Sequence, residues 1–299
     1  FLFGSIRLIF NVCSTFFTTS VFVTAPVLVC FDAFGLTSSV VVAGGGGDNA
    51  VSAIGVGAVS PGDAFISLGT SGVLFVVTDA YRPAPQSAVH AFCHVLPNLW
   101  HQMSVMLSAA SCLQWFCRLV GVTETELLEE IAQLSDADKA SAPMFLPYLS
   151  GERTPHNDPH ARGLFWGLTH SSQRALMGYA VLEGVSFGIA DGLRVLQESG
   201  TAIEQCSLVG GGARSPFWAQ LLADILDMPV VTHKGGETGG ALGAARLACL
   251  AAGKPLAAVC EKPEIFKTWR SDPERHNALM QRYQQFTALY HNDLNYRNQ

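Results

Sequence analysis

The sequence predicts an α/β fold. From residue 34 onward, strand-like runs of β-branched and aromatic residues alternate with helix-like runs, which is the pattern of α/β and α+β proteins. Glycine-rich turns follow several of the strand-like runs. The chain has 299 residues and is 49% apolar, so it is long enough for one large domain or two ordinary ones.

The first part of this region predicts two helices, a strand and a hairpin. SVVVAG (39–44) is typical of a short buried strand, and NAVSAIGVGAV (49–59) of a helix whose small residues allow another backbone to approach closely. DAFISLGTSGVLFVVT (63–78) has two β-rich runs around Gly69, Thr70, Ser71 and Gly72, which predicts a β-hairpin. SVMLSAASCLQWFCRLVG (104–121) predicts a helix that ends at Gly121.

The second part continues the alternation. Thr123 and Glu126 form a capping box for a helix over 124–134, and a proline-containing loop follows. The longest helix is predicted over 171–200, between a serine cap and Gly200, with Glu183 half-buried and paired. Four further elements are expected: a strand at 206–210, a helix capped by Ser215 with Pro216 in its first position, a strand at 228–233 and a small-residue helix at 238–253. The tail beyond Pro263 is typical of a packed terminal helix.

Residues 1–34 differ from the rest of the chain. They contain one Arg and one Asp, and the uncharged run from Leu8 to Cys30 is long enough to cross a bilayer. However, Pro26 interrupts the run, a charged leader is lacking, and the composition resembles strand as much as helix. Two interpretations of this atypical apolar segment stay open. A signal peptide or membrane anchor is the less favoured, and a fragment boundary or a wrongly translated segment explains the composition at least as well. We expect no membrane partner.

Charge and cysteine usage exclude other classes. The net charge is −6 and the 18 Lys and Arg residues are scattered, which argues against nucleic acid as a partner. The eight cysteines contain no CxxC pair and no Cys/His ligand spacing, so a metal site held by protein side chains is not expected. Reduced cysteines indicate a cytoplasmic protein.

Three glycine clusters carry the candidate chemistry: AGGGGDN, SLGTSG and VGGGARS. Glycines after strands let backbone N–H groups reach an anion without a Cβ in the way. None of the three matches a P-loop or the dinucleotide fingerprint. Taken alone, SLGTSG is more often an ordinary hairpin, and VGGGARS is equally a tight strand-to-helix turn.

Six segments, in order along the chain, resemble the carboxyl-terminal part of the FGGY carbohydrate kinases. They are AGGGGDNAVSAIGVG, SLGTSGVLF, FLPYLSGERTPHNDPHARGLFWGLTH, AVLEGVSFGIADGL, LVGGGARSPFWAQLLADIL and GGALGAARLA. The resemblance covers about residues 34–299, and the stretches SGERTPHNDPHARG, AFCHVLP and MLSAASCLQW are similar to bacterial members that phosphorylate D-xylulose. It implies an actin-like ATPase fold with two ribonuclease-H-like domains, of which this chain carries the second.

The resemblance also implies residue roles. Asp48 would be the base that takes the sugar hydroxyl proton, and Asn49 would hydrogen-bond the sugar. Gly69 and Thr70 would contact the β- and γ-phosphates of ATP, supplied with Mg²⁺. The residues that would flank the adenosine are Gly167, Gly211, Gly212 and Ala213. One carboxylate beside a flexible glycine run suits phosphoryl transfer, which needs positioning and charge neutralisation more than covalent help.

The chain departs from the family pattern in two ways. The family's first phosphate loop, a DxGT-type turn, is absent, and so is most of the first domain. The resemblance therefore assigns 1–34 to the atypical segment, 35–62 to the end of the N-terminal domain with Asp48, and 63–299 to the C-terminal ATP-binding domain. Leu176 stands where relatives usually carry a polar residue. We expect the chain alone to bind ATP weakly and to phosphorylate sugar negligibly.

Three functions stay open from the sequence. The first is phosphorylation of D-xylulose to D-xylulose 5-phosphate. The second is a kinase for another sugar or polyol, such as ribulose or glycerol, and the third is a non-catalytic actin-like module that binds nucleotide and acts through partners. A homodimer is an open assembly state. Arg153, His156 and Arg162 receive no catalytic role, because their proline-rich loop is more often a surface connection.

Overall fold

The computed structural model describes residues 9–10, 35, 41, 43–234 and 239–298, which fall into two compact units. Unit 1 comprises the described residues within 1–59, 94–97 and 238–263, and unit 2 those within 60–93, 98–237 and 264–299. The predicted assignment of 35–62 and 63–299 to two family domains concerns a longer protein and stays a prediction. Apart from Ile9 and Phe10, the 1–34 segment lies outside the described residues.

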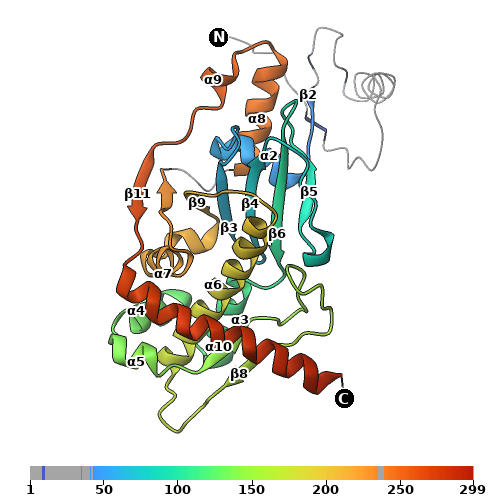
Figure 1. Ribbon diagram of the computed structural model, residues 1–299. Helices are drawn as coiled ribbons and strands as arrows, with labels where there is room; N and C mark the ends of the chain where they lie inside the picture. The colour runs from blue at the N-terminus through green and yellow to red at the C-terminus, as the bar shows by residue number, and fades with distance from the viewer. Residues whose placement is uncertain (1–8, 11–34, 36–40, 42, 235–238, 299) are drawn as a thin grey trace. The chain divides into compact units, whose positions relative to one another are not determined.

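Unit 2 is built on a seven-stranded mixed sheet in the order β11-β10-β9-β3-β4-β6-β5 (Figure 1). Its strands are β3 Ala64–Leu68, β4 Gly72–Thr78, β5 His90–Cys93, β6 Trp100–Met106, β9 Cys206–Val209, β10 Val230–His233 and β11 Ile265–Trp269. A separate hairpin pairs β7 Met144–Leu146 with β8 Leu164–Trp166. The helices are α3 Ala110–Val120, α4 Glu124–Ala132, α5 Asp136–Ala140, α6 Arg174–Glu198, α7 Pro216–Leu226 and α10 Pro273–Arg297, with 3-10 turns η1 Pro85–Ser87 and η2 Gly211–Arg214.

Helix α6 forms the centre of the unit 2 core. It packs on β4 and β6, and nearly all of its residues are buried. By length and composition it could cross a membrane, but here 94% of its most apolar stretch is covered by the fold. The predicted pairing of Glu183 is confirmed and its burial is complete: Arg282 of α10 donates to both carboxylate oxygens, at 2.7 and 2.6 Å.

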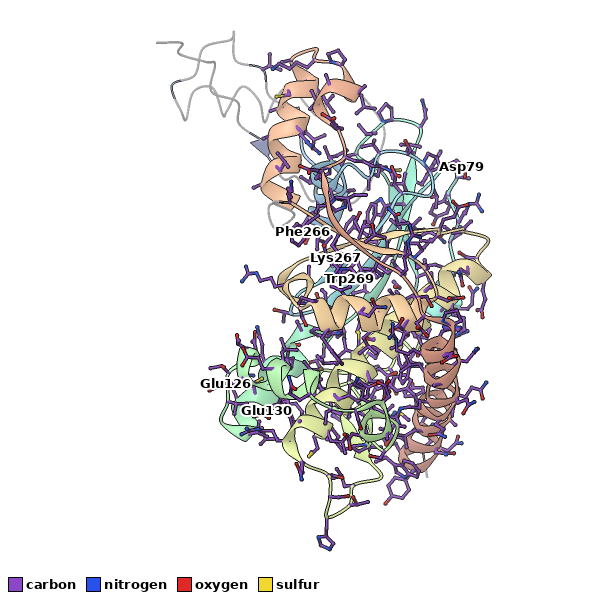
Figure 2. All side chains as sticks on the ribbon, turned by 90° about the vertical axis from the view of Figure 1, so that its left-hand side faces the viewer. Asp79, Glu126, Glu130, Phe266, Lys267 and Trp269 are labelled. Carbon is purple, nitrogen blue, oxygen red and sulfur yellow. The ribbon has the colours of Figure 1, made fainter. Side chains whose placement is uncertain are left out.

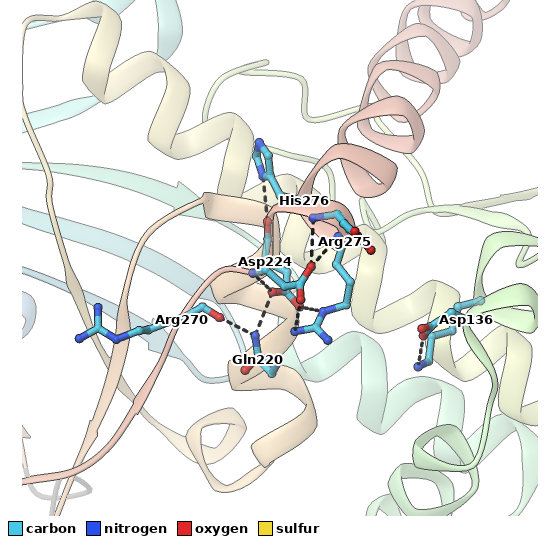
Figure 3. Close-up of polar contacts among 9 residues, drawn as sticks. Asp136, Gln220, Asp224, Arg270, Arg275 and His276 are labelled. Carbon is cyan, nitrogen blue, oxygen red and sulfur yellow. Dashed lines mark hydrogen bonds and ion pairs between the residues drawn. The ribbon is translucent and has the colours of Figure 1, made fainter.

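A second buried carboxylate fixes the start of α10 (Figure 3). Asp224 on α7 is 3% exposed; its Oδ1 accepts from Gln220 and from the backbone N–H of Asp272, and its Oδ2 accepts from Arg275 Nε at 2.8 Å. Asp272 in turn caps α10 by accepting from two backbone N–H groups. The predicted terminal helix is thus present, and its register is set by paired buried charges, which would be costly to leave unpaired.

Local signals place most boundaries correctly. The capping box of Thr123 and Glu126 is present, and Ser215 caps α7 with Pro216 in the first position. The helix predicted over 104–121 is wrong at its start, because residues up to Met106 belong to β6 and α3 begins only at Ala110. The serine cap of the long helix is also wrong: Gln173 precedes the first turn of α6 and provides no side-chain cap.

The edge strand β11 has no counterpart in the sequence prediction. It pairs antiparallel with β10, and Figure 2 shows Phe266, Lys267 and Trp269 along it. Phe266 is 69% exposed, and the Lys267 ammonium lies 3.6 Å from the centre of the Trp269 ring. A lysine on an exposed edge strand opposes pairing with another chain.

Unit 1 depends on two helices that cross at glycines. Its elements are β1 Ile9–Phe10, β2 Ala43–Gly44, α2 Asp48–Val56, α8 Gly239–Ala251 and α9 Leu256–Val259. A Cβ added to Gly243 would lie 1.8 Å from the Val51 carbonyl oxygen, and one at Gly55 would lie 1.9 Å from that of Gly239. The close approach expected of the small-residue helices is therefore confirmed.

Arg246 of α8 fastens the far end of α2. Its Nη1 donates to the carbonyls of Ile54 (2.9 Å) and Gly55 (3.0 Å), and its Nη2 donates to the carbonyl of Glu261. The last carbonyls of a helix lack intrahelical donors, so a guanidinium placed there satisfies them.

The glycine crossing predicts the effect of Gly243→Ala. The added methyl has to push α8 away from α2, which should destabilise their packing by about 1–3 kcal/mol. Amide hydrogen exchange over residues 48–56 measures this opening. Gly240→Ala is the matched control in the same helix, since its Cβ would stand 3.5 Å from Ser52 Oγ. Equal protection of α2 in both variants would contradict the packing argument.

Candidate functional site

The tip of the β3–β4 hairpin is open to solvent. Leu68 pairs with Gly72, so the loop consists of Gly69, Thr70 and Ser71. Thr70 and Ser71 are exposed, and no described residue accepts a hydrogen bond from either backbone N–H. The predicted hairpin is confirmed, and its tip offers N–H groups and hydroxyls of the kind that bind phosphate oxygens.

The beginning of α3 holds the carbonyl side of the same tip. The N–H of Ala109 donates to the Thr70 carbonyl at 2.9 Å, and that of Ala110 to the Gly69 carbonyl at 2.8 Å. Ser111 Oγ also donates to the Thr70 carbonyl, at 2.7 Å. The Gly69 N–H donates within the loop to the Ser71 carbonyl at 3.1 Å, so the N–H groups of Thr70 and Ser71 are those without an acceptor among the described residues.

The third glycine cluster packs directly on the base of this hairpin. Strands β3 and β9 are parallel, with Ser67 opposite Val209, so their carboxyl ends lie at one edge of the sheet. Gly210 has φ +88°, and a Cβ there would lie 2.8 Å from the Leu68 carbonyl oxygen. A Cβ at Gly212 would lie 2.4 Å from a methyl of Leu68.

This packing brings most of the expected ATP-binding residues to one place. Gly69 and Thr70 follow β3 directly, while Gly211, Gly212 and Ala213 follow β9 after Gly210. Gly211 is exposed, and a Cβ there would meet nothing within 4 Å. The edge therefore presents bare backbone next to the open hairpin tip.

Gly167 lies elsewhere in the topology. It follows β8, in the separate β7–β8 hairpin, with φ +84° and open space around the position of a Cβ. Its role beside the adenosine stays a prediction.

Asp48 and Asn49 belong to unit 1. Asp48 is the first residue of α2, it is exposed, and its Oδ1 accepts from the backbone N–H and side-chain amide of Asn49 at 2.8 and 3.2 Å. The positive end of a helix stabilises a carboxylate. Of the preceding glycines, Gly46 packs against Val95, whereas Gly47 has open space beside it. The proposed base therefore lies at the start of a helix, next to accessible backbone.

A sizeable pocket in unit 2 is separate from all of these residues. It encloses about 600 Å³ between α5, α7 and α10, and its cationic side chains already have partners: Lys139 with Asp136, and Arg275 with Asp224. None of the expected ATP-binding residues lines it. Its volume is therefore no evidence for a nucleotide site, and the exposed backbone of the glycine turns is the more suitable place for phosphates.

Glu152 is a buried acid that the sequence analysis did not single out. It is 3% exposed, its Oε1 accepts from the N–H groups of Leu107 (3.0 Å) and Arg153 (2.7 Å), and its buried Oε2 has no partner among the described residues. Burial raises the pKa of Glu152 to about 7, against the two N–H donors, which favour the ionised form. The loop around Glu152 is rich in residues typical of surface turns, so the sequence gave no indication that this side chain is buried.

The fold and the arrangement of glycine turns define a domain of the actin-like ATPase class, ribonuclease-H-like in architecture. The chain belongs to the FGGY family of carbohydrate kinases, because the model of that family's C-terminal domain matches residues 64–252. Family membership and fold were both predicted from the sequence and are confirmed.

Similar proteins agree. The chain is 48% identical over 261 residues to a xylulose kinase of Escherichia coli K12, covering 86% of this chain and 53% of that protein. It is 51% identical over 211 residues to a xylulose kinase of Klebsiella pneumoniae, covering 70% and 43%. A crystal structure of a "xyloylose kinase" from Brucella ovis superposes with a TM-score of 0.81 at 48% identity, covering 88% and 54%. The chain thus spans about half the length of the relatives it matches.

The burial of Glu152 predicts a pH dependence of stability. Its folded pKa lies above the unfolded value of about 4.3, so the ionised form costs stability above pH 7, and the cost disappears as the pH falls from about 7 towards 4.5. Relative to Glu152→Gln, the native chain should gain about 2–3 kcal/mol of unfolding free energy between pH 8 and pH 5.

Denaturant titrations followed by tryptophan fluorescence measure this effect, since all five tryptophans lie in unit 2. Buried groups on which Glu152 exerts no noted electrostatic effect, such as His156, titrate in both proteins and cancel in the difference. A difference curve that stays flat from pH 8 to pH 5 would contradict the assignment.

Proposed function

We propose that this chain is the nucleotide-binding part of an ATP-dependent sugar kinase that converts D-xylulose to D-xylulose 5-phosphate. The observation that carries the proposal is the parallel pairing of β3 with β9, which sets the hairpin tip beside the glycine turn. The names of the Escherichia coli and Klebsiella pneumoniae relatives support xylulose as the sugar.

In this proposal the open hairpin tip binds the phosphates of ATP. The N–H groups of Thr70 and Ser71 and the two hydroxyls face solvent, so they are free to contact β- and γ-phosphate oxygens. Gly211 and Gly212 let the adenosine lie close to the backbone, with Ala213 and Gly167 beside it. These contacts position the phosphoryl group, and positioning supplies much of the rate enhancement in phosphoryl transfer.

Asp48 acts as the general base. Its Oδ1 is engaged by Asn49, and its Oδ2 has no hydrogen-bond partner among the described residues, so a lone pair is available to accept a sugar hydroxyl proton. Asn49 holds the sugar through its remaining amide capacity. Mounting the carboxylate on the first turn of α2 keeps it oriented without further side-chain support.

The proposal includes Mg²⁺ bound together with ATP. In kinases the ion keeps several waters and is held mostly by substrate phosphates, with one or two carboxylates. Bound MgATP supplies a phosphoryl group whose charge is partly neutralised. On the protein side, the Thr70 and Ser71 hydroxyls at the tip are oxygen donors of the hard type that Mg²⁺ accepts. The proposal also places the protein in the cytoplasm, with ribulose or glycerol as alternative acceptors and a homodimer as one assembly state.

Gly211→Val tests nucleotide binding at the glycine turn. A Cβ at this position would meet no protein atom within 4 Å and the backbone has no positive φ, so the fold should be unchanged. The valine would occupy the space of the nucleotide, and affinity for ADP should fall at least about tenfold, or about 1.4 kcal/mol. Isothermal titration calorimetry of the native and variant chains measures it. Unchanged affinity in a folded variant would place the nucleotide elsewhere.

Asp48→Asn tests the base. The chain alone is expected to phosphorylate sugar negligibly. The assay therefore uses a chimera in which residues 43–299 replace the matching part of the Escherichia coli xylulose kinase. In this chimera D-xylulose-dependent ADP release should fall by a factor of about 10²–10⁴ on substitution, as for loss of a general base.

The control for this substitution is Asp79→Asn. Asp79 pairs with Arg82 on the surface of unit 2, so its loss should leave the rate unchanged. An active Asp48→Asn chimera would refute the role of Asp48. A chimera that binds ADP but phosphorylates none of xylulose, ribulose and glycerol would favour a non-catalytic module.

A further inference from the structure

Strand β6 extends beyond its neighbour on one side. It pairs with β4 along its whole length, from Trp100 to Met106, but with β5 only from Trp100 to Met103. Beyond that point one edge of the strand has no strand partner. Backbone N–H groups at such an edge need other acceptors when they are buried.

The loop after β7 supplies those acceptors with side chains. Val105 N–H donates to Thr154 Oγ1 at 3.0 Å, while the Thr154 N–H donates back to the Val105 carbonyl. Two residues further along, Leu107 N–H donates to Glu152 Oε1 at 3.0 Å. Thr154 and Glu152 therefore continue the sheet edge that β5 leaves unpaired.

Leu107 leads directly into the segment that holds the hairpin tip. Ala109 and Ala110 donate to the carbonyls of Thr70 and Gly69, and Ser111 donates to Thr70 as well. Only Ser108 lies between Leu107, which contacts Glu152, and Ala109, which makes the first of these hydrogen bonds. A displacement of Leu107 would be transmitted to the tip because Ser108 and Ala109 are both buried.

We propose that Glu152 is a positioning residue for the phosphate-binding hairpin: by fixing Leu107 it sets the orientation of the backbone at Gly69 and Thr70. The inference rests on the proposed function, since it assigns phosphate binding to this tip. Glu152 does not touch the nucleotide and acts through segment 107–111.

The loop that carries Glu152 stays anchored without its side chain. Backbone hydrogen bonds join Glu152 and Asp158 in both directions at 2.8 Å. Asp158 also accepts from Tyr290 and Arg297 of α10. Substituting Glu152 should therefore remove the Leu107 contact while leaving the loop in place.

The experiment compares Glu152→Ala with Glu152→Gln in the 299-residue chain, with Arg153→Ala as the matched control, because Arg153 is exposed in the same loop. Glu152→Ala should speed amide exchange at Ala109 and Ala110 at least tenfold, with α6 unchanged. The same variant should bind ADP at least tenfold more weakly and bind adenosine with unchanged affinity. Glu152→Gln keeps an acceptor oxygen, so this variant should show native amide exchange and native ADP affinity. The Arg153→Ala control should also show native values for both.

The outcomes separate the two proposals. Native exchange at Ala109 and Ala110 in a folded Glu152→Ala chain would overturn the positioning role, as would equal losses for ADP and adenosine. Faster exchange in a chain whose native form binds no ADP would support the hairpin contact and refute the nucleotide site. If the alanine variant does not fold, Glu152→Asp, one methylene too short to reach Leu107, should show the same selective loss of ADP.

Discussion

The candidate site depends on the contact between Leu68 and the glycine turn after β9. Because β3 and β9 pair in parallel, both strands end at one edge of the sheet. The distance between the loops that follow them is set by the residue that packs between these loops. Gly210 and Gly212 leave room for the backbone and side chain of Leu68 and for nothing else. The packing of one apolar residue thus sets the spacing of the two loops.

Buried charges serve the architecture of unit 2 in a different way. Glu183 on α6 and Asp224 on α7 are both buried, and each is met by an arginine of α10, Arg282 or Arg275. A buried carboxylate without its partner is far more costly than an exposed one, so these pairs permit only one placement of the terminal helix. Because α10 also holds Asp158 of the Glu152 loop, this placement reaches the support of the hairpin tip.

The sequence predicts this fold well where the signal is local. Hairpin glycines, the capping box at Thr123 and the Ser215–Pro216 start of α7 depend on nearest neighbours and are correct. The start of α3 is not determined by local sequence. Residues 104–106 have a helix-compatible composition, and they form a strand because they pair with β4. Glu152 is missed for the same reason, since its partner Leu107 is 45 residues away and its loop has the composition of a surface turn.

The sequence locates the glycine clusters, but it does not distinguish the structural environments of the individual glycines. Sequence spacing identifies each cluster, yet Gly212 is a packing residue against Leu68, Gly211 faces open space, and Gly46 accommodates Val95. All three positions are glycine, and they differ in what an added Cβ would contact. A glycine that packs against protein is required for folding. Only at a glycine that faces solvent is the space that a side chain would occupy available to a ligand. By that criterion Gly211, which is exposed, is the glycine of this turn with open space for the proposed nucleotide, whereas Gly212 brings the turn against Leu68.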